Sequence, residues 1–452
     1  MNKIIQTIKN IWNIEDLRNR ILLTIGLIAI YRFGSFVVIP GVDSAQLSEL
    51  EKQTSDGLLG LLNLFTGGAF SQASIFALGI MPYISASIVI QLLGMAIPYF
   101  QKLQREGESG RRKINNITRY LTILITGGQA PGYIANLKAT LPQSAFLLND
   151  IKFLWFFDMF WVSSIIILVT GTMFVMWLGE KITDRGIGNG ISLLIMIGII
   201  ASFPRSLAQE FVSALSSTGG GLVVFVVEML ILLVVITITI LLVQGTRRIP
   251  VQYAKRVVGN RQYGGVRQFI PLRVNAAGVM PIIFAQAIMF VPITIIGFTE
   301  SEAMQGLAAT LTDFSGFWYN LIFFFMIVGF TYFYTAITVN PNQMADDMKK
   351  NGGFIPGVKP GRSTAEYLDS IMSRITLPGS IFLGMVAILP AFAMKAGINI
   401  QFAQFYGGTS LLILVGVVLD TLQQIESHLL MRHYDGLMDS GRIKGKSAGK
   451  YM

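Results

Sequence analysis

Few residues of this chain have the types and spacing that catalysis or ligand binding requires. The segment 441–447 (GRIKGKS) resembles a phosphate-binding loop, but Ser440 stands where the first glycine is needed and no strand precedes it. The run of Gly186, Gly188 and Gly190 lacks the spacing of a dinucleotide-binding turn. The sequence contains no HExxH pattern. It also contains no cysteine, so thiolate ligands are excluded. We therefore expect neither an enzyme nor a resident cofactor or metal.

Ionisable residues are also rare within the apolar segments. Ion-coupled transporters usually keep a carboxylate near the bilayer centre, where its charge is costly and serves the coupling. The acidic residues found here lie near segment ends, where we expect interfacial positions or helix contacts: Asp158, Glu228, Asp420 and Glu426. His428 and His433 lie at the end of the last segment, which favours an interfacial role over metal ligation. Arg32 is expected to extend its charge from the first segment to the interface.

The composition is that of a membrane protein. Of the 452 residues, 52% are hydrophobic and 13% are charged, against roughly 25% charged in ordinary soluble domains. Mean hydropathy is +0.59. A helix of about 20 apolar residues crosses a hydrocarbon core of about 30 Å. Ten such segments are predicted, at residues 21–39, 75–97, 117–136, 154–178, 188–203, 222–243, 275–296, 317–338, 376–394 and 408–428.

The charges between these segments predict the orientation of the chain. With both termini and every second loop placed in the cytoplasm, those regions hold 29 of the 35 lysines and arginines. The opposite loops hold five, and the remaining one is Arg32. Because cytoplasmic loops of membrane proteins carry an excess of Lys and Arg, this bias predicts that both termini are cytoplasmic. Most of the net charge of +10 then faces the cytoplasm.

Two phrases occur twice in the chain, in the same order. Residues 79–82 (GIMP) return as 278–281 (GVMP), and residues 192–198 (SLLIMIG) return as 410–416 (SLLILVG). Five helices per copy invert the second copy relative to the first. We therefore predict an all-α membrane protein with two inverted five-helix halves, 1–210 and 211–452. Duplicated helices marked by Gly and Pro are a sequence sign of a pathway through the membrane at the repeat interface.

The duplicated helices carry isoleucines in matching places. Ile80, Ile84 and Ile88 follow helical spacing on one face, and Ile191 and Ile195 do so on another helix. Aligning the repeats sets Ile84 against Ile283 and Ile195 against Ile413. Stiff, branched side chains that converge from four helices make a narrow apolar constriction, which holds back ions by dewetting. The alternative is that these isoleucines face lipid or pack between helices.

Residues 57–69 (GLLGLLNLFTGGA) form an apolar stretch that is too short to span a bilayer. Stretches of 10 to 14 residues are typical of re-entrant or interfacial segments. We interpret this one as a short helix that folds back into a cavity, with a surface loop or an amphipathic cap as the alternative.

Several cytoplasmic segments resemble hallmark segments of the bacterial SecY family. They are residues 106–113 (EGESGRRK), 183–192 (TDRGIGNGIS) and the region from Asn340 and Pro341 to residues 352–357 (GGFIPG). Residues 79–88 (GIMPYISASI) are similar as well. The similarity covers nearly the whole chain, and the motifs are long and specific.

The resemblance implies a protein-conducting channel whose two halves form a clamshell around a central pore. An apolar ring closes the pore, a short plug helix blocks its outer funnel, and a lateral gate opens towards lipid between the second and seventh helices. By motif position the ring is Ile80, Ile84, Ile191, Ile195, Ile283 and Ile413. The plug falls within 57–70, on Leu58, Leu59, Leu61, Leu62, Leu64 and Phe65. Polar positions of the gate match Gln91 and Asn275.

The same resemblance implies the partners. Residues 245–273 and 340–374 correspond to loops that dock the ribosome or the motor ATPase SecA, through Arg247, Arg248, Lys255, Arg256, Arg261, Gly357 and Lys359. Small SecE-like and SecG-like membrane subunits complete the channel. Two departures from the family pattern concern this docking. Lys359 replaces a usual arginine, which loses the planar fork for bidentate contacts, and Asn260 stands before Arg261 where many relatives have two arginines.

The function implied is the passage of unfolded secretory polypeptides across the bacterial cytoplasmic membrane, with release of hydrophobic signal or transmembrane segments sideways into lipid. A cytosolic motor or the ribosome supplies the energy. The first alternative is an inverted-repeat secondary transporter of a small solute, which requires a coupling carboxylate that the sequence does not offer. The second alternative is a structural membrane scaffold.

Overall fold

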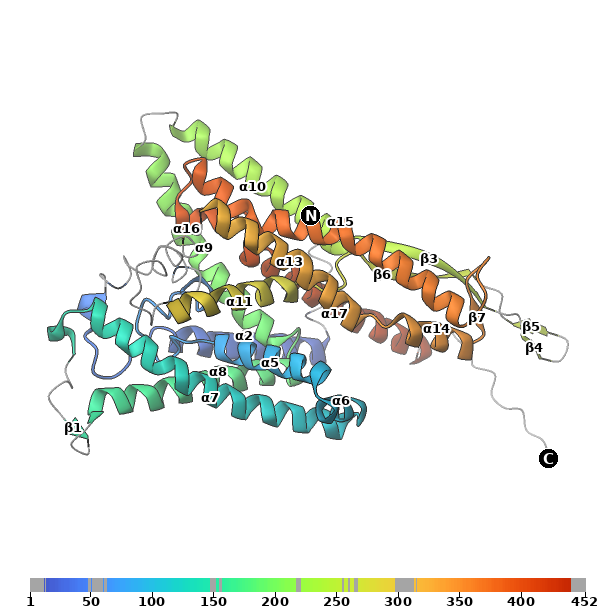
Figure 1. The fold of residues 1–452 in the computed structure, drawn as a ribbon, viewed down its shortest axis with the longest axis horizontal. Coiled ribbons are helices and arrows are strands. Elements are labelled where there is room, and N and C mark those ends of the chain that lie inside the picture. Colours follow the sequence, from blue (N-terminus) through green and yellow to red (C-terminus); the bar gives the residue numbers. More distant parts are fainter. Residues whose placement is uncertain are drawn as a thin grey trace. The chain divides into compact units, whose positions relative to one another are not determined.

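The computed structural model describes residues 12, 14–47, 50, 60, 63–146, 152–153, 157–216, 221–253, 256–258, 261–263, 267–296, 313 and 315–439. Ten helices of 16 or more residues lie in these ranges, one on each predicted segment (Figure 1). They are α2 (Glu15–Gly34), α5 (Met81–Ala96), α7 (Glu108–Thr140), α8 (Met159–Arg185), α9 (Gly190–Ser216), α10 (Gly221–Gln244), α11 (Met280–Ile296), α13 (Phe317–Thr338), α15 (Arg362–Lys395) and α17 (Gly408–Asp439).

Six of the described helices are long and apolar enough to cross a membrane, and a bent seventh qualifies if its two parts form one span. The six lie at Met159–Arg185, Gly190–Ser216, Gly221–Gln244, Phe317–Lys350, Arg362–Lys395 and Gly408–Leu429. The seventh joins Met81–Gly94 to Pro98–Gln104 through a bend of 102°. Helix α11 has only 17 residues, and α2 begins with Glu15 and Asp16.

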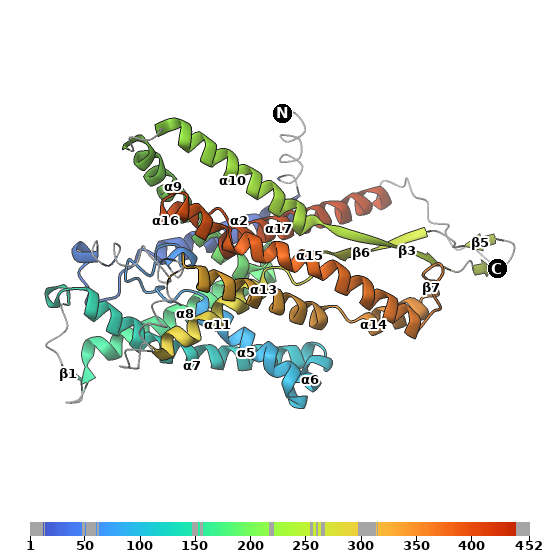
Figure 2. The same cartoon turned by 45° about the horizontal axis from the view of Figure 1, so that its top comes forward.

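Helix α7 is longer and more regular than the sequence suggests. Gly127, Gly128 and Pro131 weaken the apolar pattern, yet the helix continues for 33 residues with Pro131 inside it. It packs against α5 and α8, and α7 and α8 run side by side in Figures 1 and 2. Thr122 and Thr126 are buried and each donates a hydrogen bond to the carbonyl four residues earlier, at 2.8 and 2.7 Å. Tertiary packing therefore overrides the weak local preference.

Short elements connect the long helices. The helical ones are η1 (Ser44–Gln46), α6 (Pro98–Arg105), η2 (Gln143–Ala145), α14 (Pro341–Lys350) and α16 (Ile400–Ala403). The strands are β1 (Lys152–Phe153), β2 (Phe157–Asp158), β3 (Thr246–Tyr253), β4 (Arg256–Val258), β5 (Arg261–Tyr263), β6 (Arg267–Arg273) and β7 (Gly353–Phe354). They form a three-stranded sheet in the order β6-β3-β7 and two antiparallel pairs, β1 with β2 and β4 with β5. Figure 2 shows β3 and β6 as the longest pair of strands.

The chain divides into two compact units. The first comprises Met1–Ser55, Leu59–Ser202 and Val417–Met452, and the second comprises Asp56–Leu58 and Phe203–Gly416. In the first unit, α7 packs on α5 and α8, and its core includes Phe70, Tyr133, Leu137 and Phe160.

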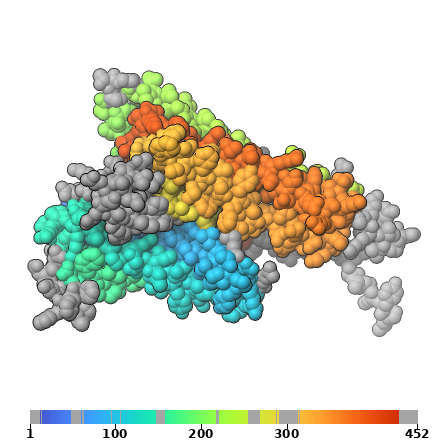
Figure 3. Space-filling model, in the orientation of Figure 1, coloured from blue at the N-terminus to red at the C-terminus, as the bar shows by residue number. Residues whose placement is uncertain are grey.

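In the second unit, α13 packs on α11 and α15, and α14 packs on α15. The side chains of α13, α14 and α15 form one continuous surface, drawn from yellow-orange to orange in Figure 3.

The repeated phrases start equivalent helices. Gly79 and Gly278 both have positive φ, at 54° and 63°, a backbone conformation that glycine adopts without a Cβ clash. The methionine two residues later is the first residue of α5 and of α11, and proline follows it in both. The second phrase begins at the third residue of α9 and at the third residue of α17. The duplication is therefore visible in the local structure.

Candidate functional site

The isoleucines of the proposed constriction occupy equivalent places within their helices. Ile84 is the fourth residue of α5, and Ile283 is the fourth residue of α11. Ile195 and Ile413 are the sixth residues of α9 and α17, and both are buried. The first unit holds Ile80, Ile84, Ile191 and Ile195, and the second holds Ile283 and Ile413. The paired isoleucines of the proposed ring therefore have the same positions in the helices as in the aligned repeats.

The described part of the proposed plug is a short helical piece followed by turns. Leu64 and Phe65 are helical and buried, whereas Leu58, Leu59, Leu61 and Leu62 lie outside the described residues. The side chain of Asn63 caps the turn by accepting a hydrogen bond from the backbone N–H of Ser71, at 3.0 Å. The hydroxyl of Tyr133, on α7, donates to the carbonyl of Phe70 at 2.8 Å. The segment is therefore fixed from within and from α7.

Two further elements of the first unit hold the same segment. From α2, the Arg32 guanidinium donates to the carbonyl of Gly67 at 3.0 Å and lies 5.4 Å from the centre of the Phe36 ring. From α9, Gly198 approaches so closely that a Cβ on it would lie 2.6 Å from the carbonyl oxygen of Phe65. Gly198 follows Ile195 by three residues, so the plug segment contacts α9 within one turn of the proposed ring.

The sequence did not single out this contact. Gly198 ends the repeated phrase 192–198, but its equivalent, Gly416, has no such neighbour, since a Cβ there would find its nearest atom at 3.9 Å. Repetition alone therefore does not mark the close approach.

Gln91 and Asn275, the polar residues expected at a lateral gate, lie in different units. Gln91 is partly buried on α5, and its amide lies 3.5 Å from the hydroxyl of Ser87, one turn earlier. Asn275 is 8% exposed, and its Oδ1 has no hydrogen-bond partner among the described residues. A buried amide oxygen without a hydrogen-bond partner is costly.

The two basic regions form one folded module in the second unit, where the sequence suggested separate loops. Strands β3 and β6 pair antiparallel, with Arg247 opposite Leu272, and β7 adds to β3 with Gly353 opposite Tyr253. Beneath the strands lies a small apolar core of Ile249, Val251, Leu272, Met348, Ile355, Leu368 and Met372. Residues 245–273 and 340–374 are thus held together by a sheet and a shared core.

The candidate docking residues lie on the outside of this module. Arg247, Arg248, Gly357 and Lys359 are exposed. In the part of the chain that the structure describes, none of the three charged ones forms an ion pair. Gly357 has φ of 85°, so the turn before Lys359 requires a residue that tolerates the left-handed region.

The remaining docking candidates belong to the β4–β5 hairpin. Arg256 is paired with Tyr263 and Arg261 with Val258, while Lys255 lies outside the described residues.

The carboxylates near segment ends are mostly engaged in helix contacts or exposed. Asp158 pairs with Lys138 of α7 at 3.0 Å, and Asp420 and Glu426 are exposed. Glu228 is buried on α10, and its Oε2 has no hydrogen-bond partner among the described residues. Glu210, which the sequence did not single out, is buried and accepts a hydrogen bond from the backbone N–H of Asn399 at 2.9 Å. Within the described ranges, no group of three or more His, Cys, Asp or Glu residues is arranged to hold a metal ion.

Comparison with known proteins gives the family. The family model described as SecY matches residues 74–422. The "Protein translocase subunit SecY" of Streptomyces scabiei is 44% identical over 435 residues, which cover 94% of this chain and 97% of the relative.

Solved structures share the fold at low identity. One is a SecY protein whose plug domain stabilises the closed state of the translocation channel and maintains a membrane seal. It matches with a TM-score of 0.59 and 16% identity over 90% of this chain and 91% of that one. Sec61 in the canine ribosome-channel complex from the endoplasmic reticulum matches with a TM-score of 0.54, 16% identity and the same coverage. The helical architecture, the duplicated helix starts and these matches together lead to one conclusion: this chain belongs to the SecY family.

Proposed function

We propose that this chain is the channel subunit of a protein translocase in a bacterial cytoplasmic membrane. The observation that carries the proposal is the 44% identity to a translocase subunit over nearly the whole of both chains. The local structure supports it, because two pairs of equivalent helices begin with the same phrases in the same register. The relatives give no support to the alternative of a small-solute transporter.

The pathway suits a polypeptide substrate. Side chains of every kind must pass, so a compliant apolar ring serves better than fixed charges or ligands. We propose that Ile80, Ile84, Ile191, Ile195, Ile283 and Ile413 form this ring. Such a ring dewets when empty, which raises the barrier to ions while it leaves room for a chain that fills it.

The plug and the gate complete this proposal. The described plug residues, Leu64 and Phe65, are buried, and α2, α7 and α9 hold the turns that follow them. In this proposal, a translocating chain displaces the plug reversibly. We assign two polar residues to the lateral gate, where a hydrophobic segment leaves for the lipid. They are Asn275, whose buried Oδ1 has no partner among the described residues, and the partly buried Gln91.

In this proposal, partners supply the energy for translocation. We propose that SecA and the ribosome dock on the module of β3, β6, β7 and α14, whose exposed Arg247, Arg248 and Lys359 suit acidic surfaces or RNA phosphates. We propose that both termini lie in the cytoplasm, because the distribution of Lys and Arg predicts this orientation. Small SecE-like and SecG-like subunits are the membrane partners that we expect.

Reconstitution tests the proposal directly. The complex is purified with its small membrane subunits and placed in proteoliposomes, and SecA, ATP and a radiolabelled precursor are added outside. We expect the precursor to become protected from protease, whereas the same chain without its signal segment stays accessible. Saturable uptake of a small solute by the same vesicles, with no protection of any precursor, would overturn the proposal in favour of the transporter.

A further inference from the structure

The turn between α8 and α9 is held by hydrogen bonds to almost every backbone amide it contains. It spans Gly186 to Gly190, the glycine run that matches no nucleotide-binding pattern. The Gly186 N–H donates to the carbonyl of Ile182 at 2.7 Å, as the cap of α8. The amides that follow are bound by side chains from three different helices of the first unit. A turn held in this way has little freedom to move.

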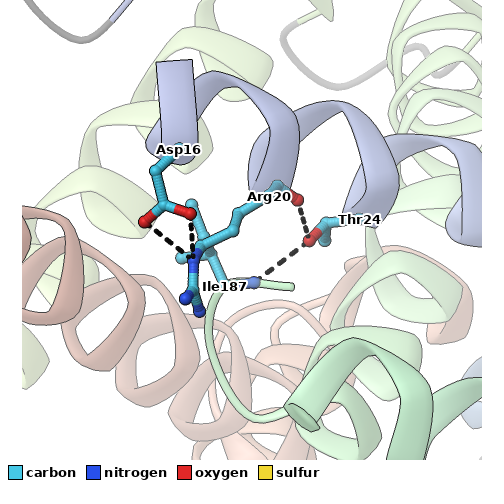
Figure 4. Close-up of polar contacts among 4 residues, drawn as sticks. All are labelled: Asp16, Arg20, Thr24 and Ile187. Atoms are coloured by element: carbon cyan, nitrogen blue, oxygen red, sulfur yellow. Dashed lines mark hydrogen bonds and ion pairs between the residues drawn. The ribbon is translucent and has the colours of Figure 1, made fainter. Parts of the chain in front are cut away.

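Helix α2 supplies the first of these side chains. The Thr24 hydroxyl donates to the carbonyl of Arg20 at 2.8 Å and accepts from the backbone N–H of Ile187 at 3.1 Å (Figure 4). Asp16 pairs with Arg20 one turn earlier. Both Thr24 and Ile187 are buried, so water does not replace this bond easily. The fit is close, since a Cβ on Gly186 would lie 2.5 Å from the Thr24 hydroxyl.

Helix α17 supplies the second of these side chains, Gln424. The Gln424 Oε1 accepts from the backbone N–H of Gly188 at 2.8 Å. Gly188 is buried with φ of 82°, and a Cβ there would lie 3.0 Å from the hydroxyl of Thr421. The turn therefore packs against one face of α17, and a side chain larger than that of glycine at position 188 would crowd Thr421.

Helix α8 supplies the third, and the turn then starts α9. The Thr183 hydroxyl accepts from the backbone N–H of Gly190 at 2.9 Å. A Cβ on Gly190 would collide with the carbonyl of Gly179, so α8 and α9 meet backbone to backbone here. The Asn189 side chain accepts from the backbone N–H groups of Ile191 and Ser192, at 3.2 and 3.4 Å, which caps the helix.

We propose that Thr24 and Gln424 are positioning residues of the channel, because they fix the turn that sets the height and rotation of α9. The inference rests on the proposed function of Ile191 and Ile195 as ring residues. Ile191 is the second residue of α9 and Ile195 lies one turn further on, so no flexible segment separates them from the turn. A helix moves as a rigid rod over this distance, and a displaced turn displaces both isoleucines together.

Spin labels measure this positioning independently of any ion flow. The chain has no cysteine, so Leu124→Cys on α7 and Ile200→Cys on α9 introduce two exposed labelling sites within the first unit. The labels report the label-to-label distance in the purified complex. In the Thr24→Val and Gln424→Leu double variant we expect the distance distribution to shift or broaden by about 1–2 Å, the size of a helix displacement. If the double variant does not accumulate in cells, the same distance is measured in the two single variants.

Matched variants separate positioning from general damage. Thr24→Ser and Gln424→Glu keep an acceptor for the Ile187 and Gly188 amides, so they restore the wild-type distribution. Thr170→Val removes a hydroxyl that, among the described residues, donates a hydrogen bond within α8 to the carbonyl of Ile166, and it leaves the distribution unchanged. An unchanged distribution in the double variant, or an equal change in Thr170→Val, would overturn the inference.

Resting ion conductance in planar bilayers then addresses the ring. A several-fold rise in leak, together with the distance change and its reversal in the Ser and Glu variants, supports both the positioning role and the ring. A distance change with a tight membrane supports the positioning of α9 and counts against Ile191 and Ile195 as ring residues.

Discussion

At the scale of single residues, the contact between Gly198 and the proposed plug segment is a close approach of two backbones. Two backbones meet there, because a Cβ on Gly198 would lie 2.6 Å from the Phe65 carbonyl and one on Gly67 would lie 2.8 Å from the Gly198 Cα. A side chain at Gly198 must push the plug away or bend α9. We propose that the closed state depends on Gly198, a residue without a functional group.

Gly198→Ala therefore loosens the closed channel. We expect a higher resting ion conductance in planar bilayers and a loss of about 1–3 kcal/mol in the stability of the plugged state, as for other overpacked sites. Gly416→Ala is the control, because Gly416 occupies the equivalent place in the repeat and a Cβ there would make only an ordinary contact, 3.9 Å from a side-chain carbon of Val279. Equal leak in the two variants contradicts the proposed seat of the plug.

Lys359 gives a second test at this scale. It is exposed just before α15, and the SecY-like pattern usually has arginine there. Lys359→Ala is expected to weaken SecA or ribosome binding, more at low salt than at high salt, because exposed charges are screened. Lys359→Arg is expected to strengthen binding through bidentate contacts.

Lys395→Ala is the control for these Lys359 variants. Lys395 is exposed at the other end of the same helix, on the side that we assign to the exterior. Binding that falls equally in Lys359→Ala and Lys395→Ala speaks against docking at this site.

The sequence anticipates residues whose roles repeat along the chain and misses those whose roles depend on distant contacts. The pairings of Ile84 with Ile283 and of Ile195 with Ile413 follow from the phrases, and the helices keep that register. By contrast, the hydrogen bond from the backbone N–H of Gly188 to the Oε1 of Gln424 joins residues 236 positions apart. No local pattern marks such a contact, because an exposed-looking glutamine near a helix end is ordinary.

At the scale of elements, the three-stranded sheet joins the two regions that we propose for docking. Charge counting describes residues 245–273 and 340–374 as two basic loops, but β7 pairs with β3 and both cover one apolar core. Alternation along β3 buries Ile249 and Val251 while Arg248 and Pro250 stay exposed. A partner that binds either region therefore contacts one folded module, and the first turns of α15 belong to that module.

Ile249→Ala tests whether the module is one body. Ile249 is 2% exposed in the shared core, and removing it is expected to cost about 2–5 kcal/mol of local stability. Both regions should then become sensitive to limited proteolysis, and SecA affinity should fall. Phe269→Ala on the neighbouring strand removes an exposed side chain and should change neither. Cleavage confined to residues 245–273 in Ile249→Ala would show that the two regions fold separately.

The hydrophobic pattern of the sequence predicts the long helices but not the short strands. Each of the ten apolar segments forms a helix, because backbone groups in lipid must be satisfied within the segment. The strands have no clear sequence signal, because arginine and glycine dilute their short alternating patterns. The long helices extend beyond the apolar segments: α15 begins at Arg362, well before the apolar run at 376, since tertiary contacts with α14 support a polar extension.

At the scale of the whole molecule, the proposed pathway depends on the duplication of the chain. We propose that residues 1–210 and 211–452 are inverted copies that line one pathway, and the equivalent helix starts at Met81 and Met280 are its local trace. Membership of the SecY family gives this duplication a function, since a pathway between two halves can open both along its axis and sideways. Sequence alone reaches the fold class and the ring candidates.

The central claim is that isoleucines from both halves close one pore. Ile84→Asn combined with Ile283→Asn places polar groups at the equivalent fourth residues of α5 and α11, which favours wetting of the constriction. Val89→Asn with Ile288→Asn is the matched control, since these exposed side chains are the ninth residues of the same helices and point elsewhere.

Resting ion conductance of the purified complex in planar bilayers is the deciding measurement. We predict a leak well above wild type for the Ile84 and Ile283 pair and a tight membrane for the Val89 and Ile288 pair. A tight membrane for both pairs, with both proteins correctly inserted, would contradict the account.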